Sequence, residues 1–324
     1  MMLNALIRFF PDPIIKFFSK LLSLPVFYKL YYFFYDLDVA LLKILKGNKE
    51  FYYFDFYGYR LAGNIRFHNG TKDSKIYDLI QSLLEKTHIN EDTVLIDIGA
   101  NIGLTSIIMA QYAKPKKARV FAFEPGDQIK YLRKNVQSTE NDGTIIVKEK
   151  ALYNQEGTLD LFTYDESIVD SRIFLDESWT TLNKNKIKSK SVPTTAFDHY
   201  IKTNHIDFSA IKLIKTDCQG AEPYIFEKMF AETEPPEELN VILEFWPYAI
   251  SKLGLDPNDF LTKVHEKFKK FNLYFFMNDS DIYSMDDCGG ISGLINKVGN
   301  GPNHFCDILI TRFSAQELEE KLEQ

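Results

Sequence analysis

Residues 94–106 read Val-Leu-Ile-Asp-Ile-Gly-Ala-Asn-Ile-Gly-Leu-Thr-Ser and are the most informative segment of this chain. Its first five residues form an apolar run that predicts a buried strand, and the glycines that follow predict a tight turn into a helix. Asp97 lies near the carboxyl end of the strand, where open α/β sheets bind ligands. The stretch therefore predicts an α/β fold with a ligand site at Asp97, Gly99 and Gly103.

The turn does not have the sequence of a dinucleotide site. Asn101 stands where a second closely spaced glycine would leave room for a pyrophosphate, and Asp97 would repel that group. A nicotinamide-dependent oxidoreductase is therefore the disfavoured alternative. S-adenosylmethionine fits better, because an acidic strand end can hold its ammonium directly or through water. Backbone groups of the turn, at Ala100 and Asn101 among others, would then meet the carboxylate and the ribose.

A second predicted strand also ends in an acid. Residues 119–124 read Arg-Val-Phe-Ala-Phe-Glu, and Pro125 follows. Acids at the end of the second strand of nucleotide-binding α/β folds accept hydrogen bonds from the ribose hydroxyls. We therefore expect Glu124 to bind the ribose of the cofactor.

Four ordered motifs carry a resemblance to a known family. They are Asp-Ile-Gly-Ala-Asn-Ile-Gly at 97–103, Ala-Phe-Glu-Pro at 122–125, Ala151-Leu152 followed by Gly157, and Lys-Thr-Asp-Cys-Gln-Gly-Ala-Glu at 215–222. Over roughly residues 74–250 the chain resembles the FkbM family of methyltransferases. One position departs from the family pattern, which commonly has an acid where this chain has Gln219.

The resemblance implies the fold and the activity. The fold would be a class I methyltransferase, with a Rossmann-like, doubly wound and mostly parallel sheet. The donor would be S-adenosyl-L-methionine, and the reaction O-methylation of a hydroxyl on a sugar, a glycolipid or another small metabolite. The second and third motifs imply that Pro125 and Ala151 belong to the cofactor site.

The favoured catalytic residue ends the fourth main strand, predicted at 211–217. Asp217 would lie beside the transferred methyl group, so we expect it to act as the general base or to orient the amino group of the donor. Glu244, at the end of a strand predicted at 241–245, is the second choice. Asp217 could instead cap the helix that begins near Glu222. The two carboxylates could also hold Mg²⁺, but two oxygen ligands do not predict a metal site.

Two further functions stay open. Enzymes that methylate exocyclic amines tend to carry an Asp/Asn-Pro-Pro-aromatic turn after this strand, whereas residues 217–220 here read Asp-Cys-Gln-Gly, so N-methylation is the weaker alternative. A catalytically inactive cofactor-binding scaffold is the other, because Gln219 departs from the family pattern.

Composition limits the class of protein and its partners. The chain has 324 residues, 45% hydrophobic and 26% charged, which is ordinary for a globular protein. Its net charge of −7 and the lack of a basic stripe disfavour nucleic acid and leave a small-molecule or glycan acceptor. Three scattered cysteines are too few for a disulfide framework, which favours a reducing cytoplasm.

Residues 1–50 differ in character from residues 51–324, which we expect to form the methyltransferase domain. The first segment is rich in Phe and Tyr, carries Arg and Lys, and has no uncharged run of the ~18–20 apolar residues that a spanning helix needs. We expect a helical appendage. Within it, residues 1–46 would form a lid over the cleft, or alternatively a peripheral contact with the inner membrane surface.

The pattern of apolar residues predicts the remaining elements. We expect a strand or a hairpin within 50–67 and a helix at 75–86. The further strands are expected near 145–150, 159–163, 273–277 and 307–311, and the further helices near 128–137, 197–202, 222–229 and 260–271. Residues 184–190 are interpreted as a solvated basic loop, and 165–190 together with 246–255 as walls of the acceptor pocket.

Overall fold

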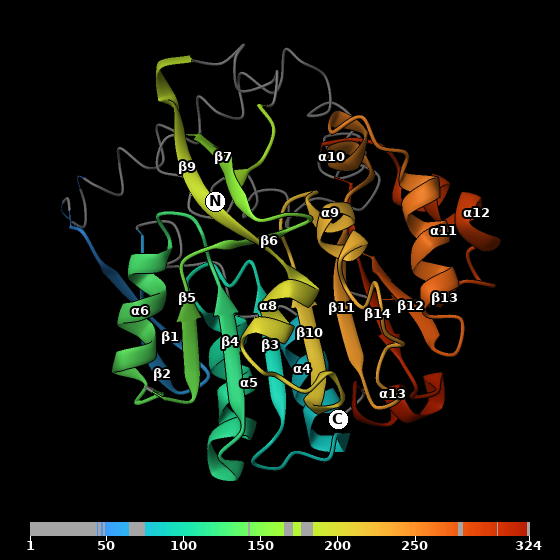
Figure 1. The fold of residues 1–324 in the computed structure, drawn as a ribbon, viewed down its shortest axis with the longest axis horizontal. Coiled ribbons are helices and arrows are strands. Elements are labelled where there is room, and N and C mark those ends of the chain that lie inside the picture. The colour runs from blue at the N-terminus through green and yellow to red at the C-terminus, as the bar shows by residue number, and fades with distance from the viewer. Residues whose placement is uncertain are drawn as a thin grey trace.

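The computed structural model describes residues 44, 47, 49–64, 75–141, 143–164, 171–175, 184–277, 281–302 and 304–322. Eight strands of this described part form a central sheet (Figure 1). In spatial order they are β13 (Asp281–Ser284), β12 (Asn272–Met277), β14 (Cys306–Thr311), β11 (Asn240–Phe245), β10 (Ile211–Thr216), β3 (Val94–Ile98), β4 (Arg119–Phe123) and β5 (Ile145–Lys148). Strands β11, β10, β3, β4 and β5 are parallel, and β14 is antiparallel to both of its neighbours. The predicted doubly wound, mostly parallel α/β sheet is confirmed.

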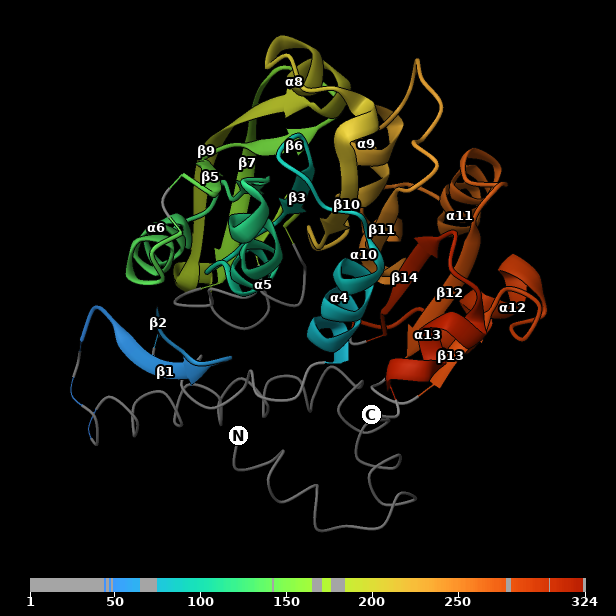
Figure 2. The ribbon, with the colours of Figure 1, turned by 90° about the horizontal axis from the view of Figure 1, so that it is seen from below.

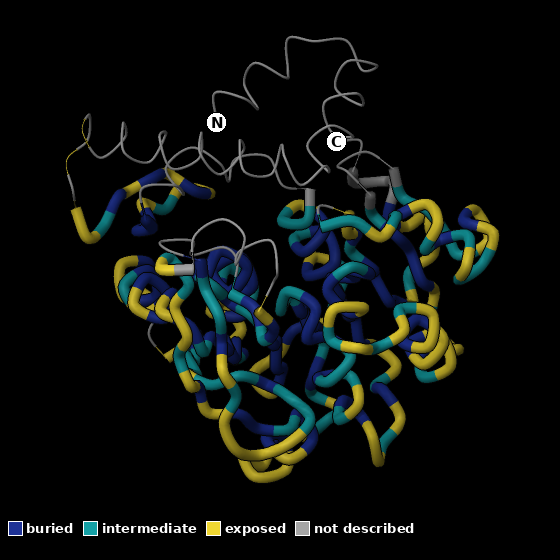
Figure 3. The backbone as a smooth tube through the Cα atoms, turned by 90° about the horizontal axis from the view of Figure 1, so that it is seen from above, coloured by how far each residue is buried: buried dark blue, intermediate teal, exposed yellow. Residues whose placement is uncertain are grey.

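Helices cover both faces of this sheet. The first face carries α4 (Lys75–Lys86), α5 (Leu104–Ala113), α6 (Ile129–Ser138) and α13 (Ala315–Leu322), and the second carries α8 (Phe197–Thr203), α9 (Glu222–Glu227), α10 (Pro247–Lys252), α11 (Pro257–Lys267) and α12 (Gly290–Val298). Strand β3 lies between the two cores and all five of its residues are buried, which explains its continuous apolar sequence. In Figure 3 the buried backbone accordingly runs through the middle of the molecule. Among the described residues, no helix combines the length and the apolar character needed to cross a bilayer.

An antiparallel hairpin precedes the central sheet, as the sequence predicts. It consists of β1 (Tyr52–Phe56) and β2 (Tyr59–Gly63). Phe54, Phe56 and Leu61 are buried and join the core on the first face of the sheet. The hairpin lies beside α6 (Figure 2), and β2 contacts that helix. Residues 1–43, which hold nearly all of the expected appendage, lie outside the described residues.

A second, smaller sheet corrects two expectations. Its strands are β6 (Ala151–Tyr153), β9 (Ile187–Ala196), β7 (Gly157–Tyr164) and β8 (Ser171–Arg172), in that order. The interpretation of residues 184–190 as a loop is wrong, because residues 187–190 pair in register with residues 161–164 of β7. The predicted strand at 159–163 exists but belongs to this sheet and not to the central one. Residues 165–170 and 176–183 of the expected acceptor wall lie outside the described residues.

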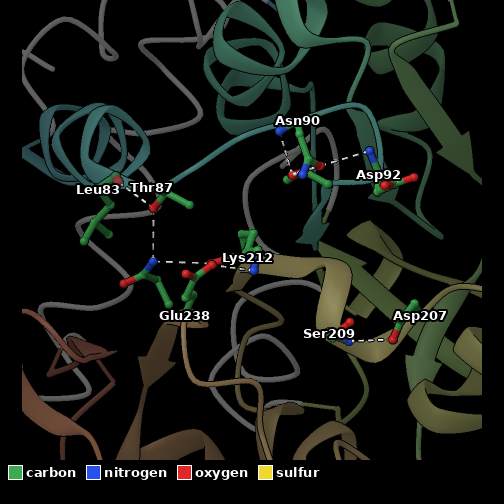
Figure 4. A network of polar contacts seen from close by, with 10 residues as sticks. Leu83, Thr87, Asn90, Asp92, Asp207, Ser209, Lys212 and Glu238 are labelled. Atoms are coloured by element: carbon green, nitrogen blue, oxygen red, sulfur yellow. Dashed lines mark hydrogen bonds and ion pairs between the residues drawn. The ribbon is translucent and has the colours of Figure 1, made fainter.

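Polar contacts connect neighbouring elements at the amino-terminal edge of the central sheet (Figure 4). Thr87 Oγ1 donates to Leu83 O at 2.7 Å, and Asn240 Nδ2 lies 3.4 Å from Thr87 Oγ1 and 3.3 Å from Lys212 O. Lys212 Nζ pairs with Glu238 at 2.6 Å. These contacts tie the starts of β10 and β11 to the end of α4.

Candidate functional site

Three acids that the sequence singles out lie at neighbouring strand ends. Asp97 is the fourth residue of β3, Glu124 follows β4, and Asp217 follows β10. Because β3 pairs in parallel with both β4 and β10, the three residues reach the same edge of the sheet. The order of the strands also reverses here, with β4 and β5 on one side of β3 and β10 and β11 on the other. Ligands of open α/β sheets bind at such a switch point.

Both glycines of the turn are required by its geometry. A Cβ on Gly99 would lie 2.1 Å from the carbonyl oxygen of Asp217, and the residue has φ +77°. Gly103 has φ +93°, precedes α5, and would bring a Cβ to 2.6 Å from Leu132 Cδ1. Any other residue at Gly99 would therefore push β3 away from β10.

The backbone N–H groups of the turn are already engaged inside the protein. Those of Gly99 and Ala100 donate to Phe123 O at 3.0 and 2.9 Å. That of Asn101, which has φ +52°, donates to Glu124 Oε2 at 2.8 Å. A phosphate at this turn would need those donors free, so the geometry agrees with the sequence argument against a pyrophosphate.

Asp97 is fully buried beneath the turn. Its Oδ2 accepts a hydrogen bond from Ser106 Oγ at 2.5 Å, whereas its buried Oδ1 has no partner in the described part of the chain. Burial raises the pKa of Asp97, while the Lys215 ammonium and the Ser106 hydroxyl oppose that rise. A buried carboxylate oxygen without a partner is costly unless a ligand or a water satisfies it.

Glu124 is also buried, and its carboxylate is held by two backbone donors. Oε2 accepts from Asn101 N at 2.8 Å and Oε1 accepts from Gly126 N at 2.6 Å. Burial raises the pKa of Glu124 to about 7, despite those hydrogen bonds. Each oxygen keeps a second acceptor position, so the carboxylate can still accept from two ligand hydroxyls.

Asp217 is an ion-paired carboxylate. Lys215 Nζ lies 2.9 Å from Oδ2, and Gln219 Nε2 donates to Oδ1 at 3.0 Å. Burial by itself would raise the pKa of Asp217, but the Lys215 ammonium and these hydrogen bonds hold it below its usual value. Asp217 is therefore charged at neutral pH, which suits the binding of a cation more than the removal of a proton.

The interpretation of Asp217 as a helix cap is wrong. The residue that precedes α9 is Ala221, and no side chain caps that helix. The carboxylate of Glu222 instead accepts from the backbone N–H groups of Cys218 and Gly220. Burial raises the pKa of Glu222 to about 7. Glu222 thus braces the turn that presents Asp217, because it takes up two of the N–H donors there.

Glu244 lies behind this turn on β11. Its Oε1 is 3.5 Å from Gln219 Nε2, and its buried Oε2 has no partner among the described residues. Burial and then the charges of Asp217 and Glu222 raise the pKa of Glu244 well above its ordinary value. Gln219, the position that departs from the family pattern, therefore lies between the two candidate catalytic acids.

A cavity of about 740 Å³, part of it open to solvent, lies above these strand ends. The cofactor residues predicted from sequence that line it are Gly99, Asn101, Glu124, Pro125, Ala151 and Asp217. The predicted cofactor residues that do not line it are Asp97, Ala100 and Gly103, and the predicted catalytic residue Glu244 does not line it either.

The sequence of this region matches a known family. Residues 97–241 match the model of the methyltransferase FkbM domain. This span of the chain, which holds the glycine turn and all three strand-end acids, is therefore similar to the FkbM methyltransferase domain. The resemblance carried by the four motifs is confirmed over that span. No curated protein matches the chain in sequence.

Solved structures with a similar course of the chain include three methyltransferases. Methyltransferase FkbM from Methylobacillus flagellatus KT is 12% identical with a TM-score of 0.40, and the alignment covers 71% of this chain and 47% of that one. An O-methyltransferase from Bacillus cereus, in complex with SAH, is 10% identical with a TM-score of 0.39 and coverages of 75% and 83%. An O-methyltransferase from Thermotoga maritima is 11% identical with a TM-score of 0.38 and coverages of 77% and 70%. This chain thus spans about half the length of the first relative.

The cavity has one wall, on β7, that the sequence did not reveal, whereas Ser171 and Ile173 lie within the wall expected at 165–190. Leu159 and Leu161 of β7 and Ser171 and Ile173 from the region of β8 line the cavity. Gln128 Nε2 donates to Ser171 Oγ at 3.0 Å and joins this wall to the start of α6. The expected wall at 246–255 contributes no residue to the cavity. The small sheet forms through long-range pairing, which leaves no local signal in the sequence.

Lys215 is a further residue of the site whose role sequence reasoning missed. A lysine inside the apolar strand Ile-Lys-Leu-Ile-Lys-Thr, two residues before an acid, is a signal that could have indicated a buried pair. In the described part of the chain, no three His, Cys, Asp or Glu side chains are grouped so that they could hold a metal ion.

Proposed function

We propose that this protein is an S-adenosylmethionine-dependent O-methyltransferase that acts on a hydroxyl of a sugar, a glycolipid or another small metabolite. The observation that carries the proposal is the glycine turn between Asp97 and Glu124, whose own N–H groups are engaged inside the protein. Such a site suits a cationic nucleoside without phosphates. The sequence match to the methyltransferase FkbM domain supports methyl transfer as the reaction.

Different residues around the turn would bind different parts of the donor. Asp97 Oδ1 would take the ammonium, through an ordered water where the distance requires one. Glu124 would accept from the ribose hydroxyls, and Pro125 and Ala151 would border the nucleoside in the cavity. Ala100 and Gly103 would act by shaping the turn, since neither lines the cavity.

The donor supplies a methyl group on a sulfonium, and its transfer to a hydroxyl oxygen leaves a proton to be removed. Asp217 lines the cavity and is charged, so it would orient the amino group of the donor. Glu244 has an unpartnered carboxylate oxygen close to Asp217 and Gln219, so we propose it as the general base. Since Gln219 separates Glu244 from the cavity, we propose that acceptor binding turns the Gln219 side chain aside.

Calorimetry with S-adenosylmethionine, S-adenosylhomocysteine and NAD tests the first step. We expect the two adenosyl ligands to bind and NAD to leave no heat of binding. Binding of NAD alone would overturn the proposal in favour of an oxidoreductase. Mass spectrometry of extracts from cells with and without the gene then seeks an acceptor that is heavier by one methyl group when the gene is present.

The choice of base is tested by two variants at saturating donor. A general base contributes about 10²- to 10⁴-fold in rate. We expect Glu244→Gln to lose turnover by about that factor while it keeps donor affinity. Asp217→Asn should mainly weaken donor binding. The reverse pattern would make Asp217 the base. Donor binding with no transfer to any hydroxyl or amine acceptor would favour the inactive scaffold.

We also propose that residues 51–324 form the methyltransferase domain and residues 1–50 an appendage with residues 1–46 as a lid. The packing of the β1–β2 hairpin on the core supports the boundary. A chain that begins at Lys49 should then aggregate or lose donor affinity, because core surface becomes exposed. If that chain stays intact but loses co-sedimentation with anionic vesicles, the segment is a peripheral membrane contact.

A further inference from the structure

Lys215 stands at the centre of a group of acids on the first face of the sheet. Register places it opposite Asp97 of β3, and alternation along the strand puts Asp217 on the same face. Its Nζ lies 2.9 Å from Asp217 Oδ2, and only 10% of its side chain is exposed. Lysine is almost never this deeply buried unless it is paired.

The charged and titratable groups around Lys215 come from every neighbouring element. Asp97 comes from β3, Asp217 from the end of β10, Asp307 from β14, and Tyr77 from α4. Glu244 of β11 and Glu222 of α9 face the same turn and feel the charge of Asp217. In the described part of the chain this group of carboxyls thus surrounds one ammonium.

We propose that Lys215 is a positioning residue for the donor: its ammonium fixes Asp217 at the strand end and supplies the positive charge that keeps the neighbouring carboxyls able to bind a cationic ligand. This inference rests on the proposed function. It also adds a role that neither the motifs nor the cavity lining indicates, since Lys215 does not touch the cavity.

The charge of Lys215 acts on Asp217 and Asp97 in the same direction. Burial alone would raise the pKa of each carboxyl, and the Lys215 ammonium lowers both. Removal of that charge leaves only the hydrogen bonds from Gln219 and Ser106 to oppose burial and mutual repulsion, so the two carboxyls take up protons at higher pH. A neutral Asp217 no longer attracts the ammonium of the donor. Donor affinity should then fall as the pH falls.

The test compares full-length Lys215→Met, Lys215→Arg and a control, Lys212→Met. Lys212 lies on the same strand and pairs with Glu238 at the opposite edge, away from the site. Calorimetry with S-adenosylhomocysteine between pH 6 and pH 9 gives the affinity of each variant relative to wild type.

For Lys215→Met we expect a loss of affinity relative to wild type, a deficit that grows at least tenfold from pH 9 to pH 6. The arginine and control variants should follow the wild-type profile. A deficit of the same size at every pH would overturn the proposal, because a merely structural role has no pH dependence.

A second measurement separates this proposal from the proposed function. Carbon-13 NMR of aspartate-labelled protein, with Asp217→Asn for assignment, follows the carboxyl directly without any ligand. The Asp217 titration midpoint should rise by more than one pH unit in Lys215→Met. An unchanged midpoint overturns the role of Lys215 even if the donor binds. If the methionine variant does not fold, Lys215→Gln keeps a hydrogen-bond donor without the charge and must give the same shift.

Discussion

Asn135 on α6 connects the hairpin to the glycine turn of the site, and its replacement should destabilise both. The side chain is fully buried, and its Oδ1 accepts from Ala62 N at 2.6 Å. Its Nδ2 donates to Ala62 O and to Ile102 O, both at 2.9 Å. Asn135→Leu removes all three hydrogen bonds and leaves three buried backbone groups without partners. Each such group costs about 1–3 kcal/mol. Allowing for local relaxation, we expect a loss of about 4 kcal/mol in the free energy of unfolding.

Urea unfolding followed by circular dichroism measures this loss, and calorimetry with S-adenosylhomocysteine measures its effect on the turn. The matched control is Asn258→Leu, where an exposed amide contacts only Asp256 on its own helix. We expect that change to stay within about 0.5 kcal/mol. Asn135→Asp should lose at least as much as Asn135→Leu, because a carboxylate would face two carbonyl oxygens. A loss of less than about 1 kcal/mol for Asn135→Leu would refute the reasoning, since the hairpin would then be held by apolar packing alone.

Three further outcomes follow from the site. Gly99→Ala should abolish donor binding and lower the free energy of unfolding more than Gly143→Ala does. Gly143 has a similar φ but open space around it, so its replacement should cost only the strain of the left-handed backbone, about 1–2 kcal/mol. Unfolding and calorimetry of both variants check this. Donor affinity should rise about tenfold from pH 6 to pH 8, because the pKa of Glu124 is about 7 and the charged carboxylate is the better acceptor for the ribose hydroxyls. The affinity of Glu124→Gln should not depend on pH in this way. The free energy of unfolding should fall as the pH rises from about 4.5 through 7. Glu124 and Glu222 have pKa values of about 7 in the folded protein against an ordinary 4.5, so the folded state binds their protons more tightly than the unfolded state does. Their contribution to stability is therefore complete below pH 4.5 and lost above pH 7. Greater stability at pH 8 than at pH 5 would contradict that assignment.

The local elements and the chemistry of the strand ends can be predicted from the amino-acid sequence. The apolar run at 94–98, the helical spacing at 75–86 and the glycine turn each depend on neighbours within a few residues, so they are readable from the chain. Asp97, Glu124 and Asp217 were predicted at one edge because parallel strands bring their carboxyl ends together.

The separate roles of these residues become visible in the folded protein. Lys215 against Asp217, the engaged N–H groups of the turn, and the wall built by β7 and β8 all depend on contacts between distant segments. The sequence also gave no reason to place Asp97 and Glu244 outside the cavity lining, or residues 187–190 in a strand. Burial and charge environment are properties of the packed sheet, and they set which acid is ionised. The physical reason is that a side chain's pKa and exposure come from its spatial neighbours, whereas local patterns specify only its element.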